Sequence, residues 1–280
     1  MDNENFNAEN FDYLKGQLEQ LGWGNLAPQL EEHIRAGKEK IELNQNEQGE
    51  VEGRTVDYEL QFNKHSEHPF YYFNRVNATL RENDEIIATA SFRSSWKLMP
   101  EEMGRILEYG DKVAVYREGI KNDAGEPFNA WISVNANQPL DEHGHLNMNT
   151  YHDRYYKKYP FDLDYSISRL PEQIKVQIKD KHEEVKDCIR QGIPYGLDVA
   201  TTDGIVQGCL SANAKVGRID ILDNNLELAK LPVPQKAERQ NTGQETSTEQ
   251  GAADEKKKPW QYQQVRGNQF RNKQGKGISR

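Results

Sequence analysis

The stretch Phe128-Asn-Ala-Trp-Ile-Ser-Val-Asn135-Ala136 shows the clearest strand pattern in the sequence. Phe128, Ala130, Ile132 and Val134 stand at alternate positions, which is the period of a strand with one buried face. The same pattern places Trp131 on the opposite face. The stretch ends on an Asn-Ala step that occurs twice more, at 77–78 and 213–214. We therefore start from this strand as the centre of one structural unit and look for its equivalents.

Each Asn-Ala step follows a helix-like segment that stops on a glycine, and these glycines are Gly37, Gly110 and Gly192. The distance from glycine to asparagine is 40, 25 and 21 residues, so the first copy carries an insertion. The order predicts an α+β fold of small repeated modules, each a helix followed by a short antiparallel sheet. The alternative is an α+β chain without a repeat, in which such coincidences also occur.

The chain divides into five predicted parts. The order is a disordered N-terminus (1–10), a first α+β module (11–94), a second module with a tyrosine-rich bridge (95–168), a third module (169–231), and a disordered linker with a basic tail (232–280). The linker is rich in Gln, Thr, Glu, Ser and Ala, and such segments bury too little apolar surface to offset chain entropy.

Several local patterns predict individual elements. Trp23 lies between two glycines and is predicted to plug the core beneath a loop. Positions 56, 58, 60 and 62 are apolar or aromatic and alternate as in a strand, and residues 70–76 predict another strand that ends at Asn77. Positions 174, 178, 185 and 189 predict one stripe of a longer helix that stops at Gly192. Asp203-Gly204 predicts a hairpin turn.

The composition excludes several classes of protein. Hydrophobic residues make up 35% of the chain, below the usual share of globular proteins. No apolar run is long enough for a transmembrane helix, and the acidic, polar N-terminus is unlike a secretory signal. Two cysteines, Cys188 and Cys209, fit neither a disulfide framework nor a zinc site. These features predict a cytoplasmic protein with reduced thiols and no membrane contact.

The net charge of −9 hides a strong asymmetry. Residues 1–231 carry 26 Lys and Arg against 40 Asp and Glu, whereas residues 232–280 carry 10 against 5. From Lys256 to the end there are eight basic residues and no acidic one. An acidic body with a basic end is typical of an interaction tail.

The tail supplies the candidate nucleic-acid-binding residues. They are Lys256, Lys257, Lys258, Trp260, Tyr262, Arg266, Arg271, Lys273, Lys276 and Arg280. Basic side chains neutralise phosphates and release counterions, and the aromatic ones can stack on unpaired bases of DNA or RNA. The alternatives are a tail that binds an acidic protein surface, including the body of this chain, and a tail that only aids solubility.

Other candidate sites have simpler interpretations. His143, His145, His152 and Asp153 could be drawn as a metal cluster, but their spacing matches no standard zinc site. The tyrosines of the bridge (151–165) could stack bases or sugars, yet tyrosines more often cover a core. The Asn-Ala steps are predicted to hold local backbone.

Gly-rich phosphate loops and a Gly-x-Ser-x-Gly motif are absent, and Cys188 has no evident histidine partner. We predict no metal, no cofactor and no catalytic residue.

The second repeat carries a family resemblance. The pattern Leu98-x-Pro-Glu-Glu, Gly110, Gly125-Glu-Pro-Phe128-x-Ala130 and Val134-Asn135-Ala136 resembles an uncharacterised domain of Bacteroidetes chromosomes and conjugative elements. That domain occurs in tandem, in some chains beside a region like a type I topoisomerase. The resemblance covers residues 95–150 best, the third repeat less well and the first poorly. It implies a mobile-element context and a link to DNA, and supplies no catalytic residue.

Together these features predict a non-enzymatic, DNA-associated accessory protein of a mobile genetic element, whose tail contacts nucleic acid. The alternative is a protein–protein interaction module whose basic tail binds an acidic partner. An enzyme forms a third class, which a pocket with convergent histidine and carboxylate groups would favour.

Overall fold

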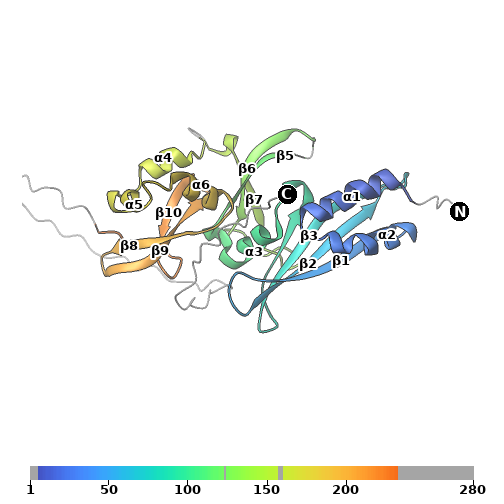
Figure 1. The fold of residues 1–280 in the computed structure, drawn as a ribbon, viewed down its shortest axis with the longest axis horizontal. Coiled ribbons are helices and arrows are strands. Elements are labelled where there is room, and N and C mark those ends of the chain that lie inside the picture. Colours follow the sequence, from blue (N-terminus) through green and yellow to red (C-terminus); the bar gives the residue numbers. More distant parts are fainter. Residues whose placement is uncertain (1–5, 123, 157–159, 233–280) are drawn as a thin grey trace, which may run out of the picture.

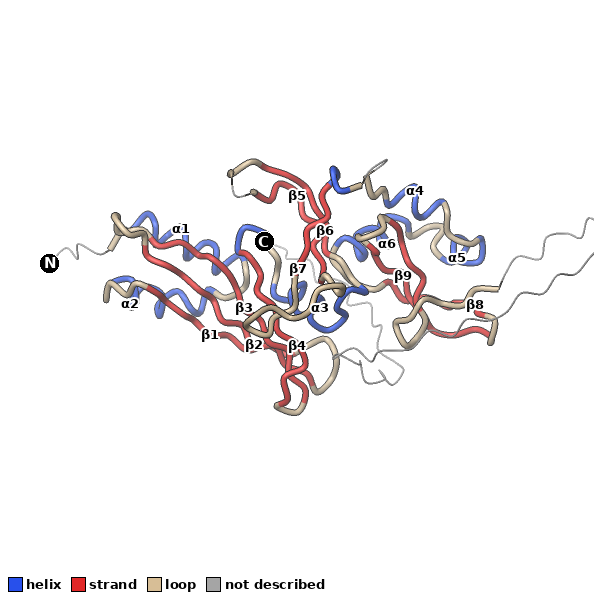
Figure 2. Tube along the Cα trace, turned by 180° about the vertical axis from the view of Figure 1, so that it is seen from behind, coloured by secondary structure: helices blue, strands red, loops and turns tan. Residues whose placement is uncertain are grey.

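The computed structural model describes residues 6–122, 124–156 and 160–232. Three antiparallel sheets lie in a row along the long axis of the molecule, each preceded by helices (Figures 1 and 2). The predicted α+β class with small antiparallel sheets is confirmed. The first sheet has four strands and the other two have three, so the idea that one module is repeated stays a prediction.

The first part is a four-stranded meander covered on one face by two helices (Figure 1). Its elements are α1 Ala8–Gln20, η1 Gly24–Leu26, α2 Ala27–Arg35, β1 Lys40–Gln48, β2 Arg54–Lys64, β3 Tyr71–Glu82 and β4 Glu85–Arg93. The predicted alternation in β2 is confirmed, because Val56, Tyr58, Leu60 and Phe62 are all buried. Strand β3 continues past Asn77 to Glu82, so the prediction that it ends there is wrong.

Residues 7–10 are more ordered than predicted, because α1 begins at Ala8 inside the segment expected to be disordered. Asn7 caps the helix, with its Oδ1 accepting from the Asn10 N–H at 2.9 Å. The Asn10 side chain pairs with the backbone of Tyr71 in both directions, at 3.0 and 2.8 Å. This tether joins residues 61 positions apart, so composition alone does not predict it.

The middle part contains the strand from which we started. Its elements are η2 Ser94–Trp96, α3 Pro100–Tyr109, η3 Gly110–Lys112, β5 Val115–Lys121, β6 Pro127–Val134, β7 Met148–His152 and η4 Asp153–Tyr155. Strand β6 pairs with β5 and β7 and is the central strand. Ala130, Ile132 and Val134 join the core of the first sheet, with Phe128 packed against it. Trp131 points to the other side, into the core of the third part.

The third part is a second meander with three short helices. Its elements are α4 Leu163–Ser168, α5 Glu172–Gln177, α6 His182–Arg190, β8 Tyr195–Thr201, β9 Gly204–Asn213 and β10 Arg218–Leu222. The expected long helix is two helices, α5 and α6. The break between them lets α5 contact β8 while α6 reaches β5 and β9. Strand β9 begins at Gly204, so the predicted hairpin is confirmed.

Strand β6 is buried on both faces from Ala130 to Val134, and this joins the three parts. One core contains side chains of α1, α2, the first sheet, α3 and β6, and it crosses the proposed boundary between residues 94 and 95. The other contains Trp131 together with α4–α6 and the third sheet. Helix α4 packs on β10, so a division after residue 168 would separate this helix from the strand that it contacts.

Two buried serines hold the connection between α3 and β5. The Ser133 hydroxyl on β6 donates to the carbonyl of Val113, and the Ser211 hydroxyl on β9 donates to that of Lys112, each at 2.6 Å. Both serines stand two residues before the asparagine of an Asn-Ala step. Strands β6 and β9 therefore hydrogen-bond to neighbouring residues of the segment between α3 and β5.

The junction between the middle and third parts also depends on Gly192. Its φ is +70°, and an added Cβ would lie 2.9 Å from Val115 Cγ2. We expect Gly192→Ala to lower the free energy of unfolding by roughly 2–5 kcal/mol, from left-handed strain and overpacking together. Gly125→Ala is the matched control: its φ is +78° with nothing within 4 Å, so it should cost only about 1–2 kcal/mol. Equal losses in urea unfolding would show that the junction is loosely packed.

Candidate functional site

The predicted nucleic-acid-binding residues, from Lys256 to Arg280, lie outside the described residues. The other candidates from the sequence lie in the body of the chain.

His143 and His145 lie in the loop before β7, and His152 is the last residue of β7. Asp141 Oδ1 accepts from the backbone N–H groups of His143 and His145, at 2.9 and 2.8 Å. The Nδ1 atom of His152 accepts from the Arg154 N–H at 3.1 Å. Within the described ranges, no three His, Cys, Asp or Glu side chains gather closely enough to hold a metal ion.

Two of the four described tyrosines of the bridge, Tyr151 and Tyr156, cover the second core. The rings of Tyr151 and Tyr156 each meet the ring of Tyr155 edge to face, with centroids 4.8 and 5.3 Å apart. Tyr151 is buried, and the Tyr156 hydroxyl donates to the carbonyl of Ala214 at 2.6 Å. Tyr155 and Tyr165 are exposed. The bridge thus packs the middle part against the third.

The three Asn-Ala steps do not form equivalent sites. Asn135 follows β6, and its Oδ1 accepts from the N–H two residues later at 3.3 Å, as predicted for a local backbone contact. Asn77 lies inside β3 and donates to Glu59 at 2.9 Å, while Asn213 ends β9 and donates to Asp220 at 2.6 Å. The prediction of local backbone contacts is wrong for these two. Their partners are side chains on neighbouring strands.

A buried ionic cluster around α3 is the most unusual polar feature of the body. Its members are Glu50, Arg54, Arg105 and Glu108, of which all but Glu50 are buried. Arg105 Nη1 lies 2.7 Å from Glu50 Oε1, and Arg105 Nε donates to the Gln191 carbonyl at 3.1 Å. Arg105 therefore links the loop after β1, helix α3 and the C-terminal end of α6.

Glu108 lies deepest in this cluster, and its hydrogen-bonding capacity is the least satisfied. Its Oε1 accepts from the Val51 N–H at 3.3 Å, and its Oε2 is buried without a hydrogen-bond partner in the described structure. Burial raises the pKa of Glu108 to about 7. The Glu50 carboxylate adds to the rise, whereas the Val51 amide and the Arg54 guanidinium oppose it. Glu108 therefore titrates near neutral pH.

Sequence reasoning missed this cluster. Carboxylates are so numerous in this chain that no pair of them is informative. Met103, Ile106 and Leu107 mark the apolar stripe of α3, which places Arg105 and Glu108 on its predicted solvent side. Only the packing of α3 between the other parts buries them, and no sequence signal indicates it.

A shallow surface pocket of about 440 Å³ lies beside α4, α5 and α6. Charged groups of both signs line it, including Asp164, Lys175 and His182, beside the exposed Val176. The neighbouring Lys186 amine lies 2.8 Å from Asp164 and 2.7 Å from Glu183. These are ion pairs on a helical surface. The pocket lining also includes Ser168, whose hydroxyl donates to the Tyr165 carbonyl at 2.7 Å.

None of the described helices combines the length and apolar character that crossing a bilayer requires. No protein-family model matches the sequence, no curated protein matches it, and no solved structure matches the fold. The resemblance to the tandem Bacteroidetes domain therefore stays a prediction.

Proposed function

We propose that the chain is a non-enzymatic, DNA-associated accessory protein of a mobile genetic element, acting in the cytoplasm through its basic aromatic tail. The separation of charge along the chain is the observation that carries this proposal. Residues 1–231 hold a net charge of −14, whereas residues 256–280 hold eight basic residues and no acidic one. Positive charge of this density binds phosphates by releasing counterions. The mobile-element context rests on the resemblance alone.

The contacts of the body support this division of roles. Several of its cations are held by carboxylates, as in the pairs Arg81–Asp57 at 2.6 Å and Arg105–Glu50 at 2.7 Å. The excess of acidic groups repels nucleic acid and favours contacts with proteins instead. We assign protein contacts to the α+β body, and phosphate contacts to the tail. The same acidic body competes for the tail, which makes DNA binding sensitive to salt.

The test measures DNA binding by fluorescence anisotropy, with the full chain and a full-length variant whose eight basic tail residues are replaced by Gln. We expect the native chain to lose affinity roughly 10²–10⁴-fold between 50 and 200 mM salt, as for four to seven phosphate contacts. The variant should lose nearly all binding at low salt. A second variant, with the five tail lysines replaced by Arg, keeps the charge and should bind like the native chain. Equal DNA binding by the native chain and the Gln variant would refute a tail contact.

Substitution of the aromatic tail residues distinguishes nucleic-acid binding from the alternative, binding to an acidic protein partner. Stacking on unpaired bases contributes about 1–3 kcal/mol per base. Replacing Trp260 and Tyr262 by Ala should therefore weaken single-stranded DNA binding and leave binding to polyglutamate unchanged. Loss of neither would favour a tail that reads charge alone, and hence the protein-partner function.

A further inference from the structure

The loop after β1 closes directly over the carboxyl group of Glu108. Gly49 approaches so closely that a Cβ on it would lie 2.5 Å from Glu108 Oε1. The Gly49 N–H donates to the Arg54 carbonyl at 2.9 Å, and the Arg54 N–H donates to the Val51 carbonyl at 3.1 Å. Residues 49–54, which we call the 49–54 loop, therefore form a compact turn whose inner amide, that of Val51, binds Glu108.

Charged and titratable groups face Glu108 from each neighbouring element. The 49–54 loop contributes Glu50, whose side chain is 42% exposed, and the buried Arg54. Arg54 is held by Glu82 of β3 at 3.1 Å. Helix α3 contributes the Tyr109 hydroxyl and β2 contributes the Tyr58 hydroxyl, and the charge of Arg105 on α3 acts on both tyrosines. Arg54 and Arg105 already have carboxylate partners, so neither cation is dedicated to Glu108.

A buried carboxylate needs several donors or a dedicated cation to stay ionised. Glu108 has two backbone amides beside it, those of Val51 and Glu50, no dedicated cation, and one oxygen without a hydrogen-bond partner in the described structure. A neutral carboxyl group is less costly to bury at this position, since it carries no charge. An ionised carboxylate is stabilised by moving toward water, and the 49–54 loop blocks that movement.

We propose that Glu108 is a pH-sensitive latch for the 49–54 loop: the neutral carboxyl holds the loop closed on α3, and ionisation releases it. Arg105 extends the effect, because it joins Glu50 of this loop to the Gln191 carbonyl at the end of α6. Opening of the loop therefore loosens one contact between the first and third parts. This latch is independent of the tail and of nucleic-acid binding.

The direction of the pH effect follows from linkage. The closed state holds the Glu108 proton up to pH about 7, whereas a solvated carboxyl group loses it near 4.5. The closed loop is therefore most stable at acidic pH, loses stability as pH rises between these values, and levels off above pH 7. Between pH 6 and pH 8 the opening equilibrium should shift about ten-fold toward the open loop.

Hydrogen exchange of the full chain tests the latch. The protection factors of the Val51 and Arg54 amides, corrected for intrinsic exchange, should fall about ten-fold from pH 6 to pH 8. In Glu108→Gln they should change little, because the side chain no longer titrates. Glu101→Gln is the matched control: it removes an exposed carboxylate from the same helix and should behave like the native chain.

Unchanged protection of the native loop between pH 6 and pH 8 would overturn the proposal, as would a ten-fold fall that persists in Glu108→Gln. If that variant does not fold, a carbon-13 NMR titration of the native side chains replaces it. A Glu108 carboxyl group that titrates near neutral pH supports the latch, and one that titrates near 4.5 rules it out.

Discussion

Replacing Ile132 with Asp should abolish cooperative unfolding of the protein. Ile132 lies at the centre of β6, is fully buried, and faces the core that the middle sheet shares with the first. The change removes about 1.5–3 kcal/mol of apolar burial and places a carboxylate where it has no partner. The total exceeds about 4–5 kcal/mol, a large part of the stability of a typical protein. Thermal unfolding followed by circular dichroism measures the result.

Asn129→Asp is the matched control for this change. It introduces the same charge on the same strand, but position 129 is exposed. The Asn129 Oδ1 accepts from the Gly119 N–H at 3.0 Å, and an Asp oxygen can do the same. This variant should melt within a few degrees of the native chain. A soluble Ile132→Asp protein with a cooperative transition near the native one would show that β6 is not a core strand.

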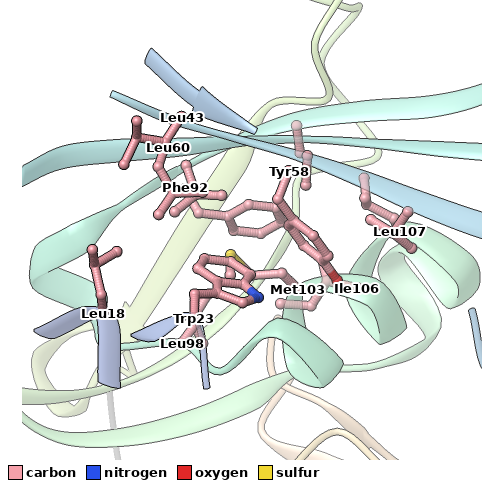
Figure 3. Packing of buried hydrophobic residues seen from close by; sticks show 14 of the residues in the cluster. Leu18, Trp23, Leu43, Tyr58, Leu60, Phe92, Leu98, Met103, Ile106 and Leu107 are labelled. Atoms are coloured by element: carbon pink, nitrogen blue, oxygen red, sulfur yellow. The ribbon is translucent and has the colours of Figure 1, made fainter. Parts of the chain in front are cut away.

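The second large effect is expected from Trp23→Ala. Trp23 is 1% exposed and lies beside Tyr58 and Met103 beneath the strands of the first sheet (Figure 3). Its ring centroid is 5.1 Å from that of Tyr58, and its Nε1 donates to Glu47 at 2.5 Å. Truncation leaves a large cavity and an unpaired carboxylate, so we expect a loss of about 3–5 kcal/mol in urea unfolding.

Trp23→Phe separates the two contributions. Phenylalanine keeps most of the buried ring and loses only the N–H donor, so this variant should lose about 1–2 kcal/mol. Glu47→Gln, which leaves the ring in place, serves as the companion change. If Trp23→Ala costs no more than Trp23→Phe, then the hydrogen bond and not the packing is what Trp23 contributes.

Short-range patterns predicted much of the fold. Alternation in β2 and β6 identified the buried faces of both strands, and Asp203-Gly204 located the hairpin between β8 and β9. These predictions succeed because period and turn chemistry are set by neighbours along the chain. The prediction of one helix from Ile174 to Ile189 fails for the opposite reason. The apolar spacing is compatible with one helix, but the two helices pack differently: α5 contacts β8, whereas α6 contacts β5, β8 and β9.

Long-range contacts account for what the sequence did not reveal. The Asn10–Tyr71 tether joins the start of α1 to β3, and the Ser133 and Ser211 hydroxyls hold one connecting segment from two sheets. A serine two residues before Asn135 and Asn213 is visible in the sequence, but its role depends on a segment that both sheets contact. The Arg105–Glu50 pair likewise joins residues 55 positions apart.

The strand Phe128–Ala136 shows where the two kinds of information divide. Sequence alone determined its conformation and the opposite directions of Ile132 and Trp131, since successive side chains of a strand point to opposite faces. Only the tertiary structure decided that both faces are buried, by the first core on one side and the second on the other. The same burial decided the chemistry of α3. It removed Glu108 from water and left its Oε2 without a hydrogen-bond partner in the described structure, whereas helical periodicity alone would have placed it in solvent.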